Sequence, residues 1–436
     1  MSINTAGRES GGPQVTAGTD APPPARRQIW LDALRGVAVL FVLFEHTLDA
    51  LFHEVREAIS PWFDFGQYGV MVFFLVSGYV VPASLERRGS VAAFWIGRLF
   101  RLYPLWIVVA IMGTWFGLLE VYSALPVQLR DHPIESGIAH LTMLQDFLQV
   151  VSVVNVFWTL SYEMVFYLLV TAIFVIGQRR VNTTGTLACT MAGVLVGGVL
   201  PAGALSRGLG DETVVVIATV ALVAGLTAVL LGRNGVRLCG AAVLAALALV
   251  LLGANSRIGA WQSLAIIATM FAGTALYRMD QGQLRRGVGW LIGLVPVVSI
   301  SAAIWFGPGW GMSEQQALAF KWSWSTAVAA AWLTFVAGRL LRSWAVPRFL
   351  LGLGLISYSV YLLHPLALQG LRRMLPDPAQ VSLPERLTWS VALLVVIITC
   401  AVLSYRYIER PAQEVGRRLA RSAARKERAR TPVTET

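Results

Sequence analysis

Residues 31–48 read LDALRGVAVLFVLFEHTL, an apolar run that is interrupted by charged side chains. With its flanks, at 29–50, the run has about the 20 residues that a helix needs to cross a bilayer. Eleven more apolar runs of similar length follow, at 66–83, 102–120, 157–177, 185–203, 213–232, 236–253, 261–277, 287–306, 323–340, 350–370 and 387–408. The sequence therefore predicts an all-α fold, a polytopic bundle of about 10–12 transmembrane helices.

The composition excludes most classes of soluble protein. Of the 436 residues, 56% are hydrophobic and 14% are charged, whereas a soluble domain carries about 25% charged residues. The net charge is +11, and most Lys and Arg residues fall in alternate connections and at the C-terminus. This bias predicts that both termini lie in the cytoplasm. It also explains the charge without nucleic acid as a partner, for which the sequence carries no binding motif.

The chain divides into three segments. Residues 1–28 are rich in Gly, Pro, Thr and Ala and are predicted to form a disordered cytoplasmic tail. Residues 29–411 are predicted to form the membrane domain. Residues 412–436 are predicted to form a basic cytoplasmic tail, helical or disordered, near anionic lipid headgroups. The three cysteines stand far apart in apolar runs, so no disulfide or metal site is expected.

Ionisable side chains inside spans are costly, so each is a candidate functional residue. Arg35 and His46 are eleven residues apart on one helix, about 16 Å and three turns, and so share one face. Asp32 is placed to pair with Arg35. Arg98 and Arg101 lie one turn apart, a spacing that suits phosphate binding. The plainer interpretation is that Arg35 snorkels to the interface and His46 lies at the outer headgroups. Arg98 and Arg101 would then be a positive-inside anchor.

Two further spans carry ionisable groups. Glu163 lies inside the run 157–177, where a lone carboxylate must be protonated, paired or hydrogen-bonded. Tyr358, Tyr361 and His364 recur every three residues as a polar stripe, for which the alternative is helix packing through interhelical hydrogen bonds. By depth, the histidines and Glu163 fall in the outer half of the bundle and the three arginines at its inner end. The sequence thus predicts a phosphate-binding mouth on the cytoplasmic side with an acid–base cluster above it.

Short motifs stand in a fixed order along the chain. They are Arg35 and His46 with ten residues between them, SGY at 77–79, RLFRLYP at 98–104, WTLSYEMVFY at 158–167, SYSVYLLH at 357–364 and ERP at 409–411. In this order the motifs resemble those of the acyltransferase 3 family of integral-membrane O-acyltransferases. The resemblance extends over most of the chain.

The resemblance implies an enzyme that transfers acyl groups other than aminoacyl groups. In the family the acyl group, often acetyl, comes from cytoplasmic acyl-CoA and goes to a hydroxyl of a glycan, a glycolipid or a small molecule. Acyl-CoA, with acetyl-CoA expected, is then a co-substrate, and no tightly bound cofactor is implied. The implied location is the bacterial inner (cell) membrane, whose lipids surround the bundle.

The resemblance also suggests a role for each candidate residue. His46 is expected to be the general base, oriented by Glu163 or another carboxylate. Arg35, Arg98 and Arg101 are expected to bind acyl-CoA. The expected site-lining residues are Ser77, Tyr79, Trp158, Tyr358, Tyr361 and His364. The alternatives are a proton-coupled secondary transporter, with its buried His and Glu groups as a proton relay, and a scaffold or sensor with packed polar helices.

Overall fold

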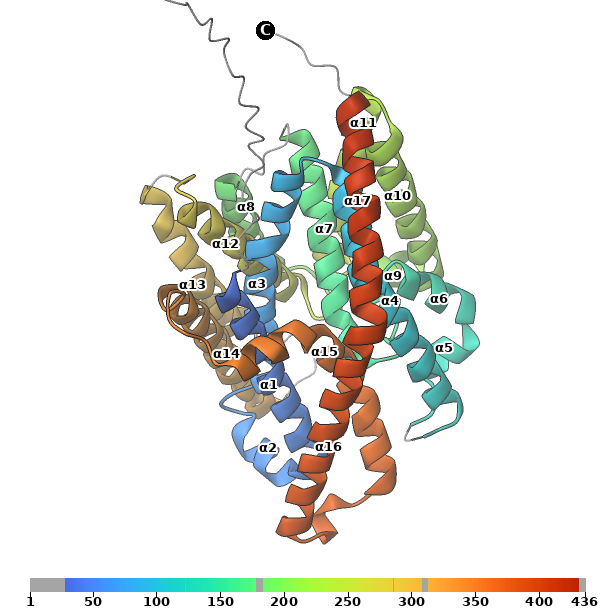
Figure 1. Ribbon diagram of the computed structural model, residues 1–436, viewed down its shortest axis with the longest axis vertical. Helices are drawn as coiled ribbons and strands as arrows, with labels where there is room; N and C mark the ends of the chain where they lie inside the picture. The colour runs from blue at the N-terminus through green and yellow to red at the C-terminus, as the bar shows by residue number, and fades with distance from the viewer. Residues whose placement is uncertain (1–27, 122, 178–182, 285, 308–312, 431–436) are drawn as a thin grey trace, which may run out of the picture.

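The computed structural model describes residues 28–121, 123–177, 183–284, 286–307 and 313–430. Every regular element in these ranges is a helix, and the long helices stand side by side in one bundle (Figure 1). This confirms the predicted all-α class. The tail predicted at 1–28 lies, except for Gln28, outside the described residues.

Each of the twelve apolar runs forms a helix. These helices are α1 (Ile29–Leu51), α3 (Phe65–Arg88), α4 (Val91–Leu118), α7 (Trp158–Ile176), α8 (Thr183–Gly197), α10 (Asp211–Leu231), α11 (Asn234–Ala254), α12 (Ala260–Asp280), α13 (Gly289–Phe306), α14 (Glu314–Leu340), α15 (Arg348–Met374) and α16 (Leu383–Ser404). The shorter helices are α2 (His53–Ile59), α5 (Val127–Asp131), α6 (Pro133–Leu141) and α9 (Ala204–Leu209). A π-helical turn, Tyr405–Glu409, joins α16 to a last helix, α17 (Arg410–Arg430).

Nine helices in the described part of the chain are long and apolar enough to cross a membrane. This confirms the polytopic bundle. α1 and α14 have the necessary length, at 23 and 27 residues, but carry more polar and charged side chains. α8 is apolar but has 15 residues, which is shorter than a typical span. These three helices account for the difference from the twelve apolar runs.

The long helices differ in how much of their surface the protein itself covers. In α12, 94% of the most apolar stretch is buried inside the protein, whereas the value for α4 and α13 is 28%. α12 therefore runs through the centre of the bundle, and α4 and α13 present most of their apolar surface outward, as lipid-facing helices do. α1 packs against both α3 and α15, so its polar residues are enclosed by neighbouring helices.

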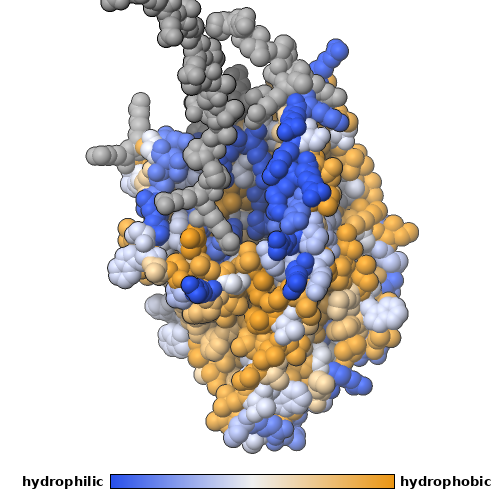
Figure 2. Space-filling model, in the orientation of Figure 1, coloured by the Kyte–Doolittle hydropathy of each residue, from blue (hydrophilic) through white to orange (hydrophobic). Residues whose placement is uncertain are grey.

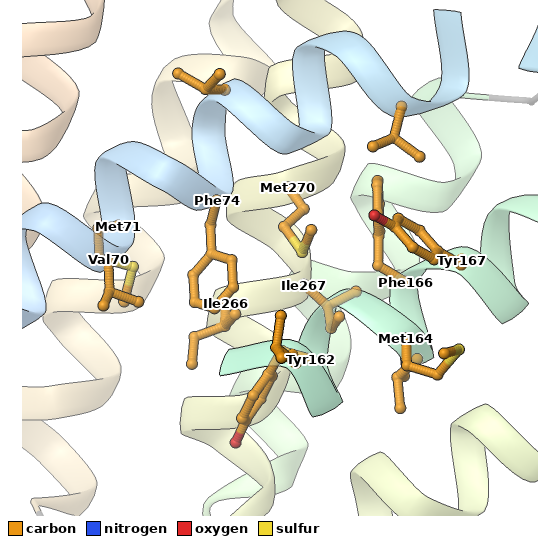
Figure 3. Close-up of a cluster of buried hydrophobic side chains, with 14 of the residues drawn as sticks. Val70, Met71, Phe74, Tyr162, Met164, Phe166, Tyr167, Ile266, Ile267 and Met270 are labelled. Carbon is orange, nitrogen blue, oxygen red and sulfur yellow. The ribbon is translucent and has the colours of Figure 1, made fainter. Parts of the chain in front are cut away.

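α3 and α12 cross closely at the centre of the bundle. A Cβ built on Gly78 would lie 1.8 Å from the Met270 carbonyl oxygen, and one on Gly273 would lie 2.4 Å from the Leu75 carbonyl oxygen. Only glycine allows two helix backbones to approach so closely. Figure 3 shows the side chains that surround this crossing: Met71 and Phe74 from α3, Tyr162 and Phe166 from α7, and Ile267 and Met270 from α12.

Local signals set the helix ends that frame the candidate site. The Ser90 side chain accepts a hydrogen bond from the Ala93 N–H, so α4 begins at Val91, well before the apolar run at 102–120. The Asp64 side chain caps α3 in the same way through the Gln67 N–H. Gly89, with φ 61°, ends α3 in the left-handed conformation. Because α4 begins at Val91, Arg98 and Arg101 lie on α4, and Asp64 is the N-cap residue of α3.

The last helix differs from the others in its surface. α17 continues α16 after the π-helical turn, and it packs along α4. Figure 2 shows hydrophilic side chains along α17 in the upper part of the molecule and a broad apolar surface below it. The exposed basic residues of α17 include Arg417, Arg418 and Arg421. Part of the segment 412–436 is therefore helical, and its residues 431–436 lie outside the described residues.

Candidate active site

Five helices enclose a narrow cavity inside the bundle, here named the arginine cavity. Its volume is about 90 Å³. It is lined by Arg35, Val70, Phe73, Phe74, Ser77, Arg101, Leu102, Thr159, Leu160, Glu163, Ser357, Tyr358 and Tyr361. Six side chains that the sequence singled out thus meet on one cavity, although they come from α1, α3, α4, α7 and α15. They are Arg35, Ser77, Arg101, Glu163, Tyr358 and Tyr361.

Two guanidinium groups, of Arg35 and Arg101, and one carboxylate, of Glu163, line the arginine cavity. Glu163 accepts hydrogen bonds from the Ser77 hydroxyl, at 3.0 Å, and from the Tyr167 hydroxyl. Arg35 pairs with Asp32 at 3.2 Å, as the sequence predicted, and interacts electrostatically with Arg101 and Glu163. Among the described residues, no carboxylate lies within ion-pair distance of Arg101. Arg101 is therefore the cation of this cavity that is best placed for an anionic ligand.

Five predicted site residues do not line the arginine cavity, and two of them, Arg98 and Tyr79, join helices instead. Arg98 is 8% exposed, donates to the Ser84 hydroxyl at 2.9 Å, and places its guanidinium carbon 5.3 Å from the centres of the Phe94 and Tyr167 rings. It therefore joins α4 to α3 through a hydrogen bond and to α7 through a cation–π contact. Tyr79 donates to Asp280 at 2.9 Å, in a tie between α3 and α12.

The hydroxyl groups on the cavity are already engaged. Tyr358 donates to the Leu102 carbonyl oxygen at 2.8 Å. Tyr361 accepts from Thr159 at 3.0 Å and donates to the Val156 carbonyl oxygen at 3.4 Å. Ser77 donates to Glu163. Ser77 and Tyr361, which the sequence suggested as site-lining residues, would have to rearrange before either could donate a hydrogen bond to an oxyanion.

His46 and His364 form a pair of rings at the interface between α1 and α15. Their ring centres are 4.9 Å apart. The Nδ1 atom of His364 lies 3.1 Å from the Val360 carbonyl oxygen, so Nδ1 carries the hydrogen and donates it there. The Nε2 atom is then an acceptor, and it is buried without a hydrogen-bond partner among the described residues. The His46 ring is half-buried.

His46 does not line the arginine cavity. Its connection to that cavity runs through His364 and Tyr361, whose ring centres are 5.9 Å apart. Glu163 lies with the arginines of the cavity, whereas the sequence placed it by depth with the histidines. The carboxylates that act electrostatically on His46 include Asp49 and Asp64. Helical periodicity shows which face a residue occupies, but it does not show which residue of another helix it meets.

Ion pairs hold α1 on both sides of His46. Glu45 pairs with Arg56 of α2 at 2.9 Å, and Asp49 pairs with Arg372 of α15 at 2.6 Å. The pair between Asp49 and Arg372 joins the two helices that carry His46 and His364. Sequence reasoning missed this tie, although Asp49 stands one turn beyond His46 and was a usable signal.

A second and larger cavity opens between the connections at the N-terminal end of α7, here named the tryptophan cavity. Its volume is about 470 Å³. It is lined by Asp64, Gln67, Asp146, Val151, Ser152, Asn155, Trp158, Arg257, Ile258, Gln262, Phe320, Ser323 and Trp324. Of these residues the sequence had singled out Trp158 alone. Many of the others lie in connections and at helix ends, where no periodic pattern marks them.

Asp146 is the most deeply buried charge of the tryptophan cavity. Its side chain is 5% exposed and lies 3.7 Å from the Arg257 guanidinium. Burial raises the pKa of Asp146 from 3.8 to about 6, against the opposing effect of Arg257. The group therefore changes charge close to neutral pH.

A thin aromatic wall separates the two cavities. Trp158 lines the tryptophan cavity, whereas Thr159, the next residue of α7, lines the arginine cavity. The Phe74 ring lies on the arginine side with its centre 6.4 Å from that of Trp158. Two compartments thus adjoin within one turn of α7, one with arginines and one with carboxylates, amides and indole rings.

Comparison with known proteins gives one family and several distant relatives. The profile of a family described as an acyltransferase domain matches residues 28–406. The acyltransferase MdmB of Streptomyces mycarofaciens is 30% identical over 155 residues, which cover 34% of this chain and 39% of the relative. Nodulation protein 10 of Rhizobium leguminosarum bv. viciae is 30% identical over 178 residues, or 37% of this chain and 48% of that protein.

A third relative, protein 2 in the picA locus of Rhizobium radiobacter, is 32% identical over 114 residues, 25% of this chain and 55% of the relative. The chain thus spans between 39% and 55% of the length of these three proteins. No solved structure gives a significant match.

Proposed function

The chain belongs to the acyltransferase 3 family, and we propose that it transfers an acyl group, with acetyl expected, from cytoplasmic acyl-CoA to a hydroxyl of a glycan, a glycolipid or a small molecule. The family makes the chain an acyl-transfer enzyme and a multi-pass membrane protein, which argues against the transporter and scaffold alternatives. The observation that supports the finer proposal is the arginine cavity with its histidine pair one aromatic side chain away. The clustering of Lys and Arg supports a bacterial inner membrane orientation with both termini inside.

The arginine cavity is proposed as the donor site. The phosphates of acyl-CoA are anions that cannot cross a bilayer, so the donor must approach from the cytoplasm toward fixed cations. Arg101, which has no carboxylate at ion-pair distance among the described residues, and Arg35, which Asp32 holds in place, supply them. The rise of α1 from Arg35 to His46, about 16 Å, is comparable to an extended pantetheine arm.

The donor must widen the cavity. A volume of about 90 Å³ corresponds to about three water molecules at their share of liquid volume. Tyr361 lines the cavity beside His364, and the Phe73 and Tyr361 ring centres are 6.0 Å apart. Rotation of these two rings is proposed to join the arginine cavity to His46.

His46 is proposed as the general base. As it takes the proton of the acceptor hydroxyl, the acceptor oxygen attacks the thioester carbonyl carbon. The carbon–sulfur bond then breaks, and His46 returns the proton to the leaving CoA thiolate. The unpartnered Nε2 of His364 is proposed to accept the N–H of His46, which would leave the other nitrogen of His46 as the base. Glu163 is proposed to balance the two arginines and to hold Ser77 and Tyr167.

Membranes that contain the protein, incubated with radiolabelled acetyl-CoA, test this proposal through free CoA and labelled product. We expect His46→Ala to reduce acyl transfer by about 10²–10⁴-fold, the usual worth of a general base. His53→Ala is the matched control because His53, on the exposed helix α2, lies outside both cavities. His364→Phe should lower kcat and alter its pH profile with no loss of folded protein. Wild-type transfer by His46→Ala would remove His46 from the mechanism.

A further inference from the structure

We propose that the tryptophan cavity is the acceptor site and that its ligand is an uncharged carbohydrate ring. This inference rests on the proposed function, because it needs a base at His46 and a donor beyond the aromatic wall. It adds the location of the acceptor and its chemical class.

The tryptophan cavity lies where an acceptor must stand. Asp64, on its lining, interacts electrostatically with both His46 and its neighbour Glu45. A Cβ built on Gly66 would lie 3.3 Å from an Asp64 carboxylate oxygen and 3.4 Å from the Glu45 side chain, so this part of α3 touches α1 beside His46. The donor cavity adjoins on the far side of the Trp158 wall. An acceptor here would meet the thioester from the side opposite to the CoA.

Two polar atoms on the lining have no partner. The Nε2 of Gln67 and the Oγ of Ser152 are buried and make no hydrogen bond to any residue in the described part of the chain. Buried polar groups are almost always paired, so two on one cavity indicate a ligand that pairs with them. One is a donor and the other is both donor and acceptor, which suits a ligand rich in hydroxyl groups. The cavity volume of about 470 Å³ lies within the range of small-molecule sites.

The remaining lining separates into flat and polar surfaces. Phe320 and Trp324 stack with ring centres 5.9 Å apart, and Trp158 is the third aromatic residue of the lining. The C–H face of a sugar ring packs on such rings, while buried carboxylate and amide groups, here Asp146 and Gln262, bind its hydroxyls.

The charges of the cavity indicate a neutral ligand. Asp64 and Asp146 are both acidic, and the one arginine of the lining, Arg257, already pairs with Asp146. No surplus cation remains on the lining to bind a phosphate or a carboxylate. The two cavities thus differ in charge as their proposed ligands do, a polyanionic donor on one side and a neutral acceptor on the other.

The test uses purified protein in liposomes with radiolabelled acetyl-CoA and two sets of ring-sized probes. The first set is methyl glycosides of hexoses and N-acetylhexosamines, and the second is cyclohexanediols. The variants Gln67→Met and Ser152→Ala each remove one unpartnered polar atom at nearly constant shape. Gln380→Met is the matched control, because Gln380 is exposed on an outer connection and outside the cavity.

We expect at least one glycoside to become labelled, and its KM to rise 10-fold or more in Gln67→Met and Ser152→Ala. The KM for acetyl-CoA should stay constant, and the Tm of each variant should equal or exceed that of the wild type, because a purely structural polar group would lower it on removal. Labelling of the cyclohexanediols alone, or unchanged glycoside KM values in both variants, would overturn the acceptor assignment. Absence of CoA release under every condition would instead refute the proposed acyl transfer.

Discussion

The close crossing of α3 and α12 predicts that Gly78→Ala destabilises the protein, and the distances at the crossing set the size of the effect. In Gly78→Ala the new methyl group would lie 1.8 Å from the Met270 carbonyl oxygen and 2.5 Å from its carbon. Relief of such a clash costs about 1–3 kcal/mol or more. Separation of the helices also weakens the hydrogen bond from Thr274 to the Gly78 carbonyl oxygen, 2.9 Å long and worth about 1 kcal/mol. Alanine regains about 1 kcal/mol through its helix propensity.

The net destabilisation is therefore about 1–3 kcal/mol, which corresponds to a fall in Tm of roughly 5 °C. The displacement also drives Ser77 of α3 toward the arginine cavity, so acyl transfer should fall together with stability. Thermal unfolding in detergent, followed by the fraction of monodisperse protein after heating, measures the Tm.

Gly352→Ala is the matched control for the same exchange in a helix. Gly352 lies in α15, and a Cβ built there meets no atom within 4 Å. Its Tm should stay constant or rise, since only helix propensity changes, by up to about 1 kcal/mol. If both variants had the same Tm, the α3–α12 backbone contact would not exist as described, and the placement of Ser77 and Glu163 that depends on it would be wrong.

The remaining predictions concern charges. Asp146→Asn should raise the Tm at pH 8 but not near pH 4. The pKa of Asp146 is about 6 in the folded protein and 3.8 in the free side chain, so the folded protein binds this proton more tightly than the unfolded chain does. Ionisation of Asp146 therefore lowers the free energy of unfolding as the pH rises from 3.8 to 6, by on the order of 3 kcal/mol in all. A Tm difference that is independent of pH would contradict this. Arg101→Lys should raise the KM for acyl-CoA about 10-fold through loss of its forked donor, whereas Arg98→Lys should mainly lower the Tm. Equal KM changes in both variants would show that Arg98 also contacts the donor.

The sequence predicted helices wherever an apolar run reaches the length of a span, but it did not always predict where a helix begins or ends. α4 begins at Val91 rather than near 102, because Arg98 and Arg101 lower the apolarity of its first three turns without breaking the helix. The cap at Ser90 carried this information. α17 was left open between helix and disorder, since a basic, weakly apolar segment is stabilised only by what it packs on, here α4.

The sequence placed Arg35 and Arg101 together by depth, whereas it placed Glu163 with the histidines, and Glu163 lies with the two arginines instead. Arg98 and Arg101 lie one turn apart on α4, but their side chains leave the helix in different directions. Arg98 lies over the Phe94 and Tyr167 rings, whereas Arg101 lines the arginine cavity. The tryptophan cavity was missed because its polar residues come from separate connections. Such residues carry no periodic pattern, and only the tertiary fold brings them together.

α1 shows how one helix can carry charges through a membrane bundle and still act as a fixed platform. Its acidic residues are each compensated: Asp32 by Arg35, Glu45 by Arg56 and Asp49 by Arg372. This pairing lowers the cost of burying charge in a helix that is enclosed by α3 and α15. It also fixes α1 on both sides of His46. The movement that joins the donor to the base should therefore occur in uncharged aromatic side chains, with rotation of Phe73 and Tyr361, because moving α1 would break ion pairs inside the bundle.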